Sequence, residues 1–150
     1  MVPSEPQAAG APGIEARGLA RGVARLLEDY GFASLAEFTL ASGRRADVMA
    51  LGPAGKLWCV EIKTSLADFR ADAKWPDYLA YCEGFFFAVP PTFPLEVLPE
   101  DCGLIVADAY GGEVLRAAPL RPLQAARRKA VTLRFALSAA RRLGQLTDPR

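Results

Sequence analysis

The chain has 150 residues, of which 51% are hydrophobic and 9% aromatic, so it can build one folded domain and should not stay disordered. It contains no histidine, which excludes Ser-His-Asp and Cys-His catalysis, histidine-ligated zinc and nucleases with a histidine base. A bound metal should therefore have oxygen ligands, which favours Mg²⁺ or Mn²⁺.

The formal net charge of +1 hides an uneven distribution of charged residues. Residues 1–115 hold nine Lys/Arg and sixteen Asp/Glu, a balance of −7, whereas residues 116–150 hold nine Lys/Arg and one Asp, a balance of +8. A basic C-terminal segment on an acidic body indicates an anionic partner. The three cysteines lack CxxC spacing, which predicts reduced thiols in a cytosolic protein, and no apolar run reaches membrane-spanning length.

Residues 1–13 are rich in Pro, Gly and Ala and are predicted to form a disordered tail before a single domain over residues 14–146. A helix is predicted over residues 14–30, with Arg17, Arg21 and Arg25 on its polar face. Residues 34–40 are predicted to form a strand. The segments RRADVMAL and KLWCVEIKT, joined by GPAG, are typical of a hairpin.

After the hairpin, Ser65 is predicted to cap a helix that Pro76 interrupts, and the acids of this helix, Asp68 and Asp72, are expected on a solvated face. The apolar runs FFFAVP and GLIVAD predict two central strands buried on both faces. A last strand is predicted over residues 113–116 and a long helix over residues 123–143. This order predicts a mixed α/β domain, with an α-β-β-β-α-β core and about four to six strands flanked by helices.

The second strand of the hairpin carries two charged residues, Glu61 and Lys63, on one face. A hairpin centred on Ala54 places Asp47 opposite Glu61, with Cβ atoms about 4.5–5.5 Å apart. Two carboxylates at that separation repel each other by about 3–4 kcal/mol. A divalent cation, bound by both carboxylates and the Ile62 carbonyl, would remove that repulsion.

Lys63 could then activate the attacking water or stabilise negative charge on a phosphate. The alternative interpretation is an ion-pair cluster at a sheet edge, in which Lys63 only neutralises Asp47 or Glu61. The spacing of the three residues leaves both interpretations open.

RRADVMAL followed by CVEIKTS resembles the PD-(D/E)XK nuclease superfamily, with Ala46 in place of the proline. The stretches EIKTSLADFRADAKWPDY, GFFFAVP and GLIVADAYGGEVLR resemble more narrowly the MmcB-type DNA repair proteins of that superfamily. This resemblance, over about residues 14–143, implies a restriction-endonuclease-like fold, DNA as partner and Mg²⁺-dependent hydrolysis of DNA phosphodiester bonds. Because the chain has no separate reading domain, we expect recognition of DNA structure rather than sequence.

Carried over onto this sequence, the resemblance implies that Asp47 and Glu61 bind the metal and that Lys63 is the catalytic lysine. A polar residue on the next helix often reaches the active site in related nucleases, and Lys74 is the candidate here. Related nucleases often add a glutamate from the first helix. That additional acid stays open among three residues, Glu15, Glu28 and Glu37.

Arginines recur along the last predicted helix and could contact DNA phosphates, because the guanidinium binds two oxygens at once. Arg127, Arg134 and Arg141 form one stripe, and Arg128 and Arg142 flank it. An apolar face is predicted to meet the core, namely Ala126, Ala130, Leu133, Leu137 and Ala140. The alternative is a helix that only confers solubility.

The resemblance implies a cytoplasmic, nucleoid-associated location. It leaves other repair proteins and a second copy of the chain open as partners. Two alternative functions remain at this point. One is a nuclease fold used as a non-cleaving DNA-binding or protein-docking module, and the other is a structural subunit whose charges form an edge cluster.

Overall fold

The computed structural model describes residues 13–150, so the predicted tail, apart from Gly13, lies outside the described residues. Several predicted elements are found within a few residues of their expected bounds. The helices and strands are α1 (Ile14–Asp29), β1 (Ala33–Thr39), β2 (Arg45–Leu51), η1 (Pro53–Gly55), β3 (Leu57–Ile62), α2 (Leu66–Ala71), η2 (Trp75–Tyr81), β4 (Gly84–Val89), η3 (Leu95–Val97), β5 (Gly103–Ala107), β6 (Gly112–Arg116) and α3 (Ala125–Thr147).

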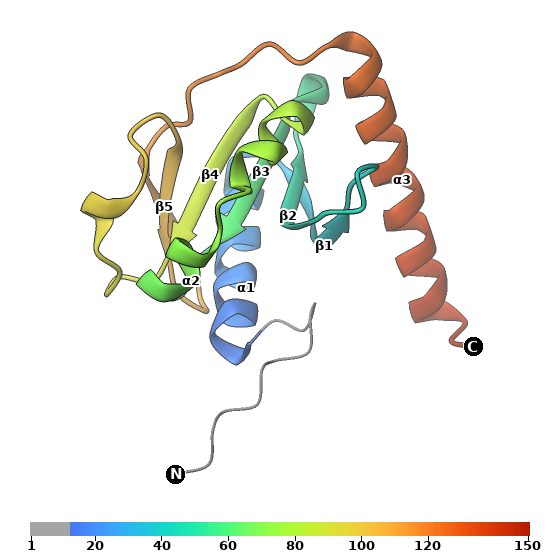
Figure 1. The fold of residues 1–150 in the computed structure, drawn as a ribbon. Helices are drawn as coiled ribbons and strands as arrows, with labels where there is room; N and C mark the ends of the chain where they lie inside the picture. Colours follow the sequence, from blue (N-terminus) through green and yellow to red (C-terminus); the bar gives the residue numbers. More distant parts are fainter. Residues whose placement is uncertain (1–12) are drawn as a thin grey trace.

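The strands form one six-stranded sheet in the order β1-β2-β3-β4-β5-β6. Strands β1, β2 and β3 pair antiparallel, β3, β4 and β5 pair parallel, and β6 returns antiparallel to β5. Every residue of β4 is buried, as expected for a central strand covered on both faces. The predicted fold class, a mixed α/β sheet of four to six strands flanked by helices, is therefore confirmed (Figure 1).

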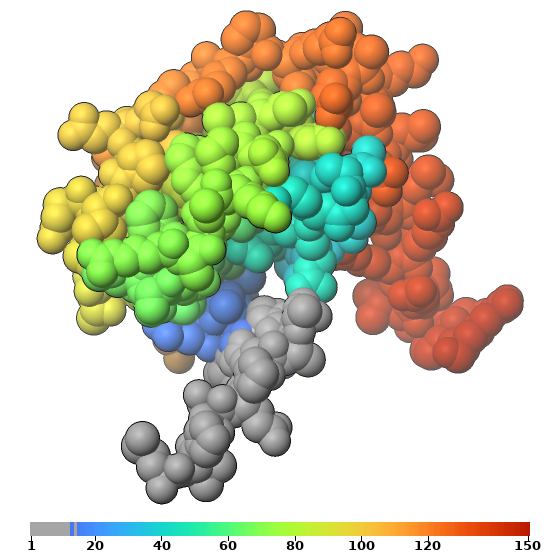
Figure 2. All heavy atoms as spheres, viewed as in Figure 1, coloured from blue at the N-terminus to red at the C-terminus, as the bar shows by residue number. Residues whose placement is uncertain are grey.

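The sheet separates two apolar layers. Helix α1 lies on one face, where Val23 and Leu27 pack with Val48 and Val60. Helices α2 and η2 cover the other face, as the ribbon and the space-filling view show (Figures 1 and 2). The helix that Ser65 caps ends at Ala71, before the break that Pro76 was predicted to impose.

A close backbone approach fixes the position of α1. A Cβ on Gly22 would lie 1.8 Å from the carbonyl oxygen of Asp108, in the turn after β5. Only glycine fits at that distance, so the contact sets the position of α1 along the sheet.

The predicted core face of the last helix is wrong. Leu133 and Leu137 are 59% and 44% exposed, whereas Val131 and Phe135 are the buried residues of α3. Helix α3 packs against the edge strand β1 and against η2 rather than across the sheet. A helix that packs beside the edge of a sheet buries only a narrow strip of its surface. The periodicity of the alanines and leucines therefore did not reveal which residues of α3 are buried.

Candidate metal-binding and catalytic site

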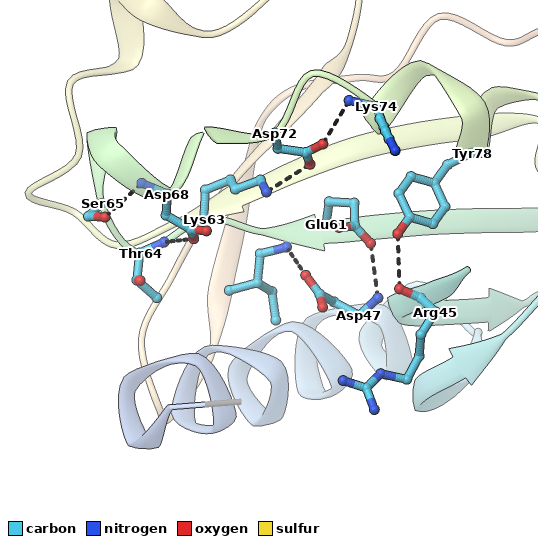
Figure 3. Close-up of polar contacts among 11 residues, drawn as sticks. Arg45, Asp47, Glu61, Lys63, Thr64, Ser65, Asp68, Asp72, Lys74 and Tyr78 are labelled. Carbon is cyan, nitrogen blue, oxygen red and sulfur yellow. Dashed lines mark hydrogen bonds and ion pairs between the residues drawn. The ribbon is translucent and has the colours of Figure 1, made fainter. Parts of the chain in front are cut away.

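The hairpin of β2 and β3 has the predicted register, with Met49 opposite Cys59. The ladder between the strands ends where Val48 faces Val60, and side chains continue the hydrogen bonding beyond it. The Asp47 amide donates to Oε1 of Glu61 at 3.0 Å, and the Ile62 amide donates to Oδ2 of Asp47 at 2.7 Å (Figure 3). Each carboxylate thus holds a backbone amide of the opposite strand.

These contacts use one oxygen of each carboxylate. The two carboxyl groups also contact each other, and this side-chain hydrogen bond acts to lower the pKa of Asp47. Burial, followed by the charge of Asp47, raises the pKa of Glu61 to about 9. Burial also raises the pKa of Asp47, against the opposing effects of the Ile62 amide and Lys63. The pair therefore retains a proton at neutral pH unless another cation compensates its charge.

Lys63 lies at the end of β3 and is only 6% exposed. Its ammonium is 2.8 Å from Oδ2 of Asp72, and its amide donates to the carbonyl of Ala88 on β4 at 3.0 Å. Asp72 follows α2, and its Oδ1 accepts a hydrogen bond from the Lys74 amide at 3.0 Å. Although burial acts to raise the pKa of Asp72, the hydrogen bond and charge of Lys63 hold it below its ordinary value.

Asp72 is the residue of this site that sequence reasoning missed. The expectation that it lies on a solvated face is wrong, since its side chain is 16% exposed and paired with Lys63. The sequence did contain one indication of this role, because Asp72 lies just before the predicted break at Pro76. The side chain of a residue at the end of a helix can turn back toward the sheet. Lys74, the predicted polar residue of this helix, is exposed, and no described residue accepts a hydrogen bond from its ammonium.

Tyr78 of η2 lies beside the carboxylates. Its hydroxyl donates to the carbonyl of Arg45 at 3.0 Å, and the guanidinium of Arg44 lies 5.2 Å from its ring centroid. Burial and the charge of Glu61 raise the pKa of Tyr78 to about 12. Tyr78 is therefore a neutral, buried neighbour of the acids.

The three candidates for an additional acid lie in different places. Glu37 lines a cavity of about 370 Å³ together with Asp47, whereas Glu15 and Glu28 are exposed near the two ends of α1. Glu37 has a left-handed backbone with φ of 52°, and its carboxylate lies 3.6 Å from the guanidinium of Arg45. In the described part of the chain, no three His, Cys, Asp or Glu side chains come together as a metal site. The predicted oxygen donors are therefore the two carboxylates and the Ile62 carbonyl.

Three of the arginines predicted to bind nucleic acid line one groove, of about 550 Å³, between α3 and the loop after β1. They are Arg127, Arg134 and Arg141. The guanidinium of Arg127 lies 4.5 Å from the ring centroid of Tyr81. Figure 2 shows the loop between β1 and β2, in cyan, close to α3.

The two flanking arginines make contacts within the protein. Arg142 donates to the carbonyls of Ala36 at 2.6 Å and Glu37 at 2.9 Å, and so holds the left-handed turn of the backbone at Glu37. Arg128 pairs with Glu83 and donates to a backbone carbonyl of the β2–β3 turn at 2.7 Å. Both guanidinium groups therefore support the fold.

Nearly the whole chain is similar to known proteins. The family model described as "DNA repair protein MmcB-like" matches residues 4–150. A solved structure, the SPO1766 protein of unknown function from Silicibacter pomeroyi, is 51% identical, with a TM-score of 0.86 over 95% of each chain. No curated protein matches. None of the helices in residues 13–150 is long and apolar enough to span a bilayer.

Proposed function

Since this chain belongs to the MmcB-like DNA repair protein family, we propose that it hydrolyses DNA phosphodiester bonds with Mg²⁺ or Mn²⁺ bound by Asp47 and Glu61. The family supplies the role in DNA repair. The nuclease chemistry, the membership of the PD-(D/E)XK superfamily and a nucleoid-associated location are parts of the proposal.

One observation carries the proposal, the contact between the carboxylates of Asp47 and Glu61 from adjacent strands. Burial raises the pKa of both, and the ammonium of Lys63, whose charge acts to lower both pKa values, is hydrogen-bonded to Asp72 and not to either acid. A purely structural pair would be expected to hold its counter-charge directly. Two carboxylates and a backbone carbonyl are the oxygen donors that Mg²⁺ and Mn²⁺ prefer, so this donor set fits such an ion.

When bound, the ion would stabilise charge on the phosphate and make water more acidic. Asp47 and Glu61 would bind it in their ionised form, after releasing the proton that they retain without metal. The ammonium of Lys63 would stabilise negative charge as it develops on the phosphate, and Asp72 would orient that ammonium. The guanidinium groups of Arg127, Arg134 and Arg141 would hold the DNA backbone independently of sequence.

The test is a panel of end-labelled DNA substrates (single strands, duplexes, nicks, flaps and junctions) incubated with Mg²⁺, Mn²⁺ or EDTA. We expect cleavage of at least one structure with metal and none with EDTA. Asp47→Asn and Lys63→Met should abolish cleavage, whereas Lys56→Met, an exposed lysine in the turn of the same hairpin, should leave it unchanged. Full activity in Lys63→Met would remove Lys63 from the mechanism.

A second candidate function is a DNA-binding or protein-docking module that does not cleave. The observation in its favour is the donor set, because the described residues offer two carboxylates and not a cluster of three acidic or other ligating side chains. The ion pair of Lys63 with Asp72 would then be structural. DNA binding without cleavage of any substrate in the panel would favour this function.

A further inference from the structure

The cavity of about 370 Å³ next to Asp47 has two oppositely charged walls. Strands β1 and β2 contribute Glu37 and Asp47, and α1 contributes Arg17 and Arg21, one helical turn apart. Neither arginine has a hydrogen bond or an ion pair from its guanidinium to any residue in 13–150. Two cations without a partner among residues 13–150 thus line the same cavity as the acids of the candidate metal site.

The cavity stays open on the side of α1 because the other residues of this helix that line it are small. Ala16, Ala20 and Ala24 recur every four residues along the helix and line the cavity together with the two arginines. The close approach of Gly22 to Asp108 holds the helix in place, so the cavity is a fixed feature of the fold. A larger side chain at any of the three alanines would project into it.

We propose that this cavity binds the phosphate of one nucleotide of a DNA strand, with the phosphate held by Arg17 and Arg21. Guanidinium groups bind phosphate oxygens in pairs, and two of them on one helix face form a fork for a single phosphate. The volume lies at the lower end of the range for ligand sites, about 300–1,000 Å³, which suits one nucleotide and not a longer segment. The identity of the ligand rests on the proposed function, to which the inference adds a binding subsite beside Asp47.

The same helix provides a matched control. Arg25 lies one turn beyond Arg21 and was predicted to share its polar face. Its guanidinium donates to the carbonyl of Tyr110 at 3.2 Å, and Arg25 does not line the cavity. Arg25→Ala therefore changes the net charge of α1 as Arg21→Ala does, without touching the proposed subsite.

The test is an NMR titration of the full chain with deoxyadenosine 5′-monophosphate and with deoxyadenosine, in EDTA and in Mg²⁺. The monophosphate should bind and the unphosphorylated nucleoside should not. Arg17→Ala and Arg21→Ala should each weaken binding about tenfold, whereas Arg25→Ala should leave it unchanged. Ala20→Leu, which fills the cavity without a change of charge in a residue that favours helix, should weaken binding as well. Thermal melting of each variant verifies that it is folded.

Three outcomes would overturn the inference: equal binding of nucleoside and monophosphate, an equal loss in Arg25→Ala, or unchanged binding in a folded Ala20→Leu. Cleavage assays separate this inference from the nuclease proposal. If the wild type cleaves DNA and the Arg17 and Arg21 variants bind the monophosphate normally, the subsite is wrong and the nuclease stands. If the monophosphate binds with the expected pattern and no DNA is cleaved, the subsite stands and the nuclease is wrong.

Discussion

The amide of Asp47 donates a hydrogen bond of 3.0 Å to Oε1 of Glu61, at the point where the backbone ladder between β2 and β3 ends. The carboxylate of Asp47 in turn accepts a hydrogen bond from the amide of Ile62. The two acids therefore connect the strands through their side chains while their charges oppose each other. Protons and metal ions should compete for this pair, and the stability of the protein should report that competition.

Glu61→Gln should remove a loss of stability that the metal-free protein shows at high pH. Burial and Asp47 raise the pKa of Glu61 from its ordinary value of 4.5 to about 9 in the folded state. The folded state then binds more protons than the unfolded state between these values. The contribution of Glu61 to stability is complete below the unfolded pKa and is lost as pH rises through the folded pKa. Glutamine is uncharged at every pH, so Glu61→Gln should not show this loss of stability.

The measurement is urea unfolding in EDTA at intervals from pH 5 to pH 9. The free energy of unfolding of the wild type should fall relative to Glu61→Gln, by on the order of 5 kcal/mol over this range. Glu113→Gln, at an exposed position on β6, is the control and should track the wild type. Parallel curves for the wild type and Glu61→Gln would mean that Glu61 is ionised throughout.

Mg²⁺ should raise the melting temperature of the wild type. At ten times its dissociation constant, a ligand specific for the folded state adds about 1.4 kcal/mol. For a domain of this size that corresponds to about 3–6 °C. Asp47→Asn should lose most of the shift, and without metal it should be as stable as the wild type or more stable, because it removes the negative charge that helps to raise the pKa of Glu61. The contrary result is a melting temperature of Asp47→Asn well below that of the wild type in EDTA, with no effect of Mg²⁺ on the melting temperature of either protein. It would identify Asp47, Glu61 and Lys63 as a structural ion-pair cluster.

The sequence was sufficient to predict the fold class and the pairing of the hairpin. Alternating apolar residues fixed which positions of RRADVMAL and KLWCVEIKT face the core, and the turn between them fixed the register. The sequence therefore placed Asp47 opposite Glu61, and the hydrogen bonds of both carboxylates to the opposite strand agree with that placement.

The partners of the charged side chains could not be predicted, since they depend on contacts between elements far apart in the chain. Lys63 was expected near Asp47 and Glu61, but its closest partner is Asp72, in a segment whose path depends on how α2 ends. Arg128 and Arg142 resemble the other arginines of α3 in sequence. Only the packing of α3 against β1 and the hairpin turn shows that these two bind backbone carbonyls.

The pair of Lys63 and Asp72 should show a coupling energy of about 1–3 kcal/mol in a double-mutant cycle. The two side chains are 8% and 16% exposed, so each charge loses its compensation when the other is removed. Lys63→Met and Asp72→Asn are each expected to lower the free energy of unfolding. The double variant should lose less than the sum of the two, as measured by urea unfolding. The exposed pair of Arg44 and Asp77 is the control and should give about 0–1 kcal/mol.

Arg134 and Arg141 should contribute to DNA affinity, whereas Arg142 should contribute to stability. Arg134 and Arg141 line the groove beside α3, and neither has a partner for its guanidinium in the described part of the chain. Replacing both by alanine should weaken binding to unrelated DNA sequences. If each contacts one phosphate, the slope of log affinity against log salt should become shallower by about 2.

Arg142→Ala is the matched control, because it removes the same charge from the same helix. It should cost about 1–3 kcal/mol of stability, since it leaves the backbone carbonyls of Ala36 and Glu37 without their donor. Its salt slope should equal that of the wild type at a temperature where both are folded. Fluorescence anisotropy of a labelled duplex between 50 and 200 mM salt, a range of about fourfold, resolves these slopes. Equal slopes for the wild type, the double variant and Arg142→Ala would show that Arg134 and Arg141 make no phosphate contacts and only keep the helix soluble.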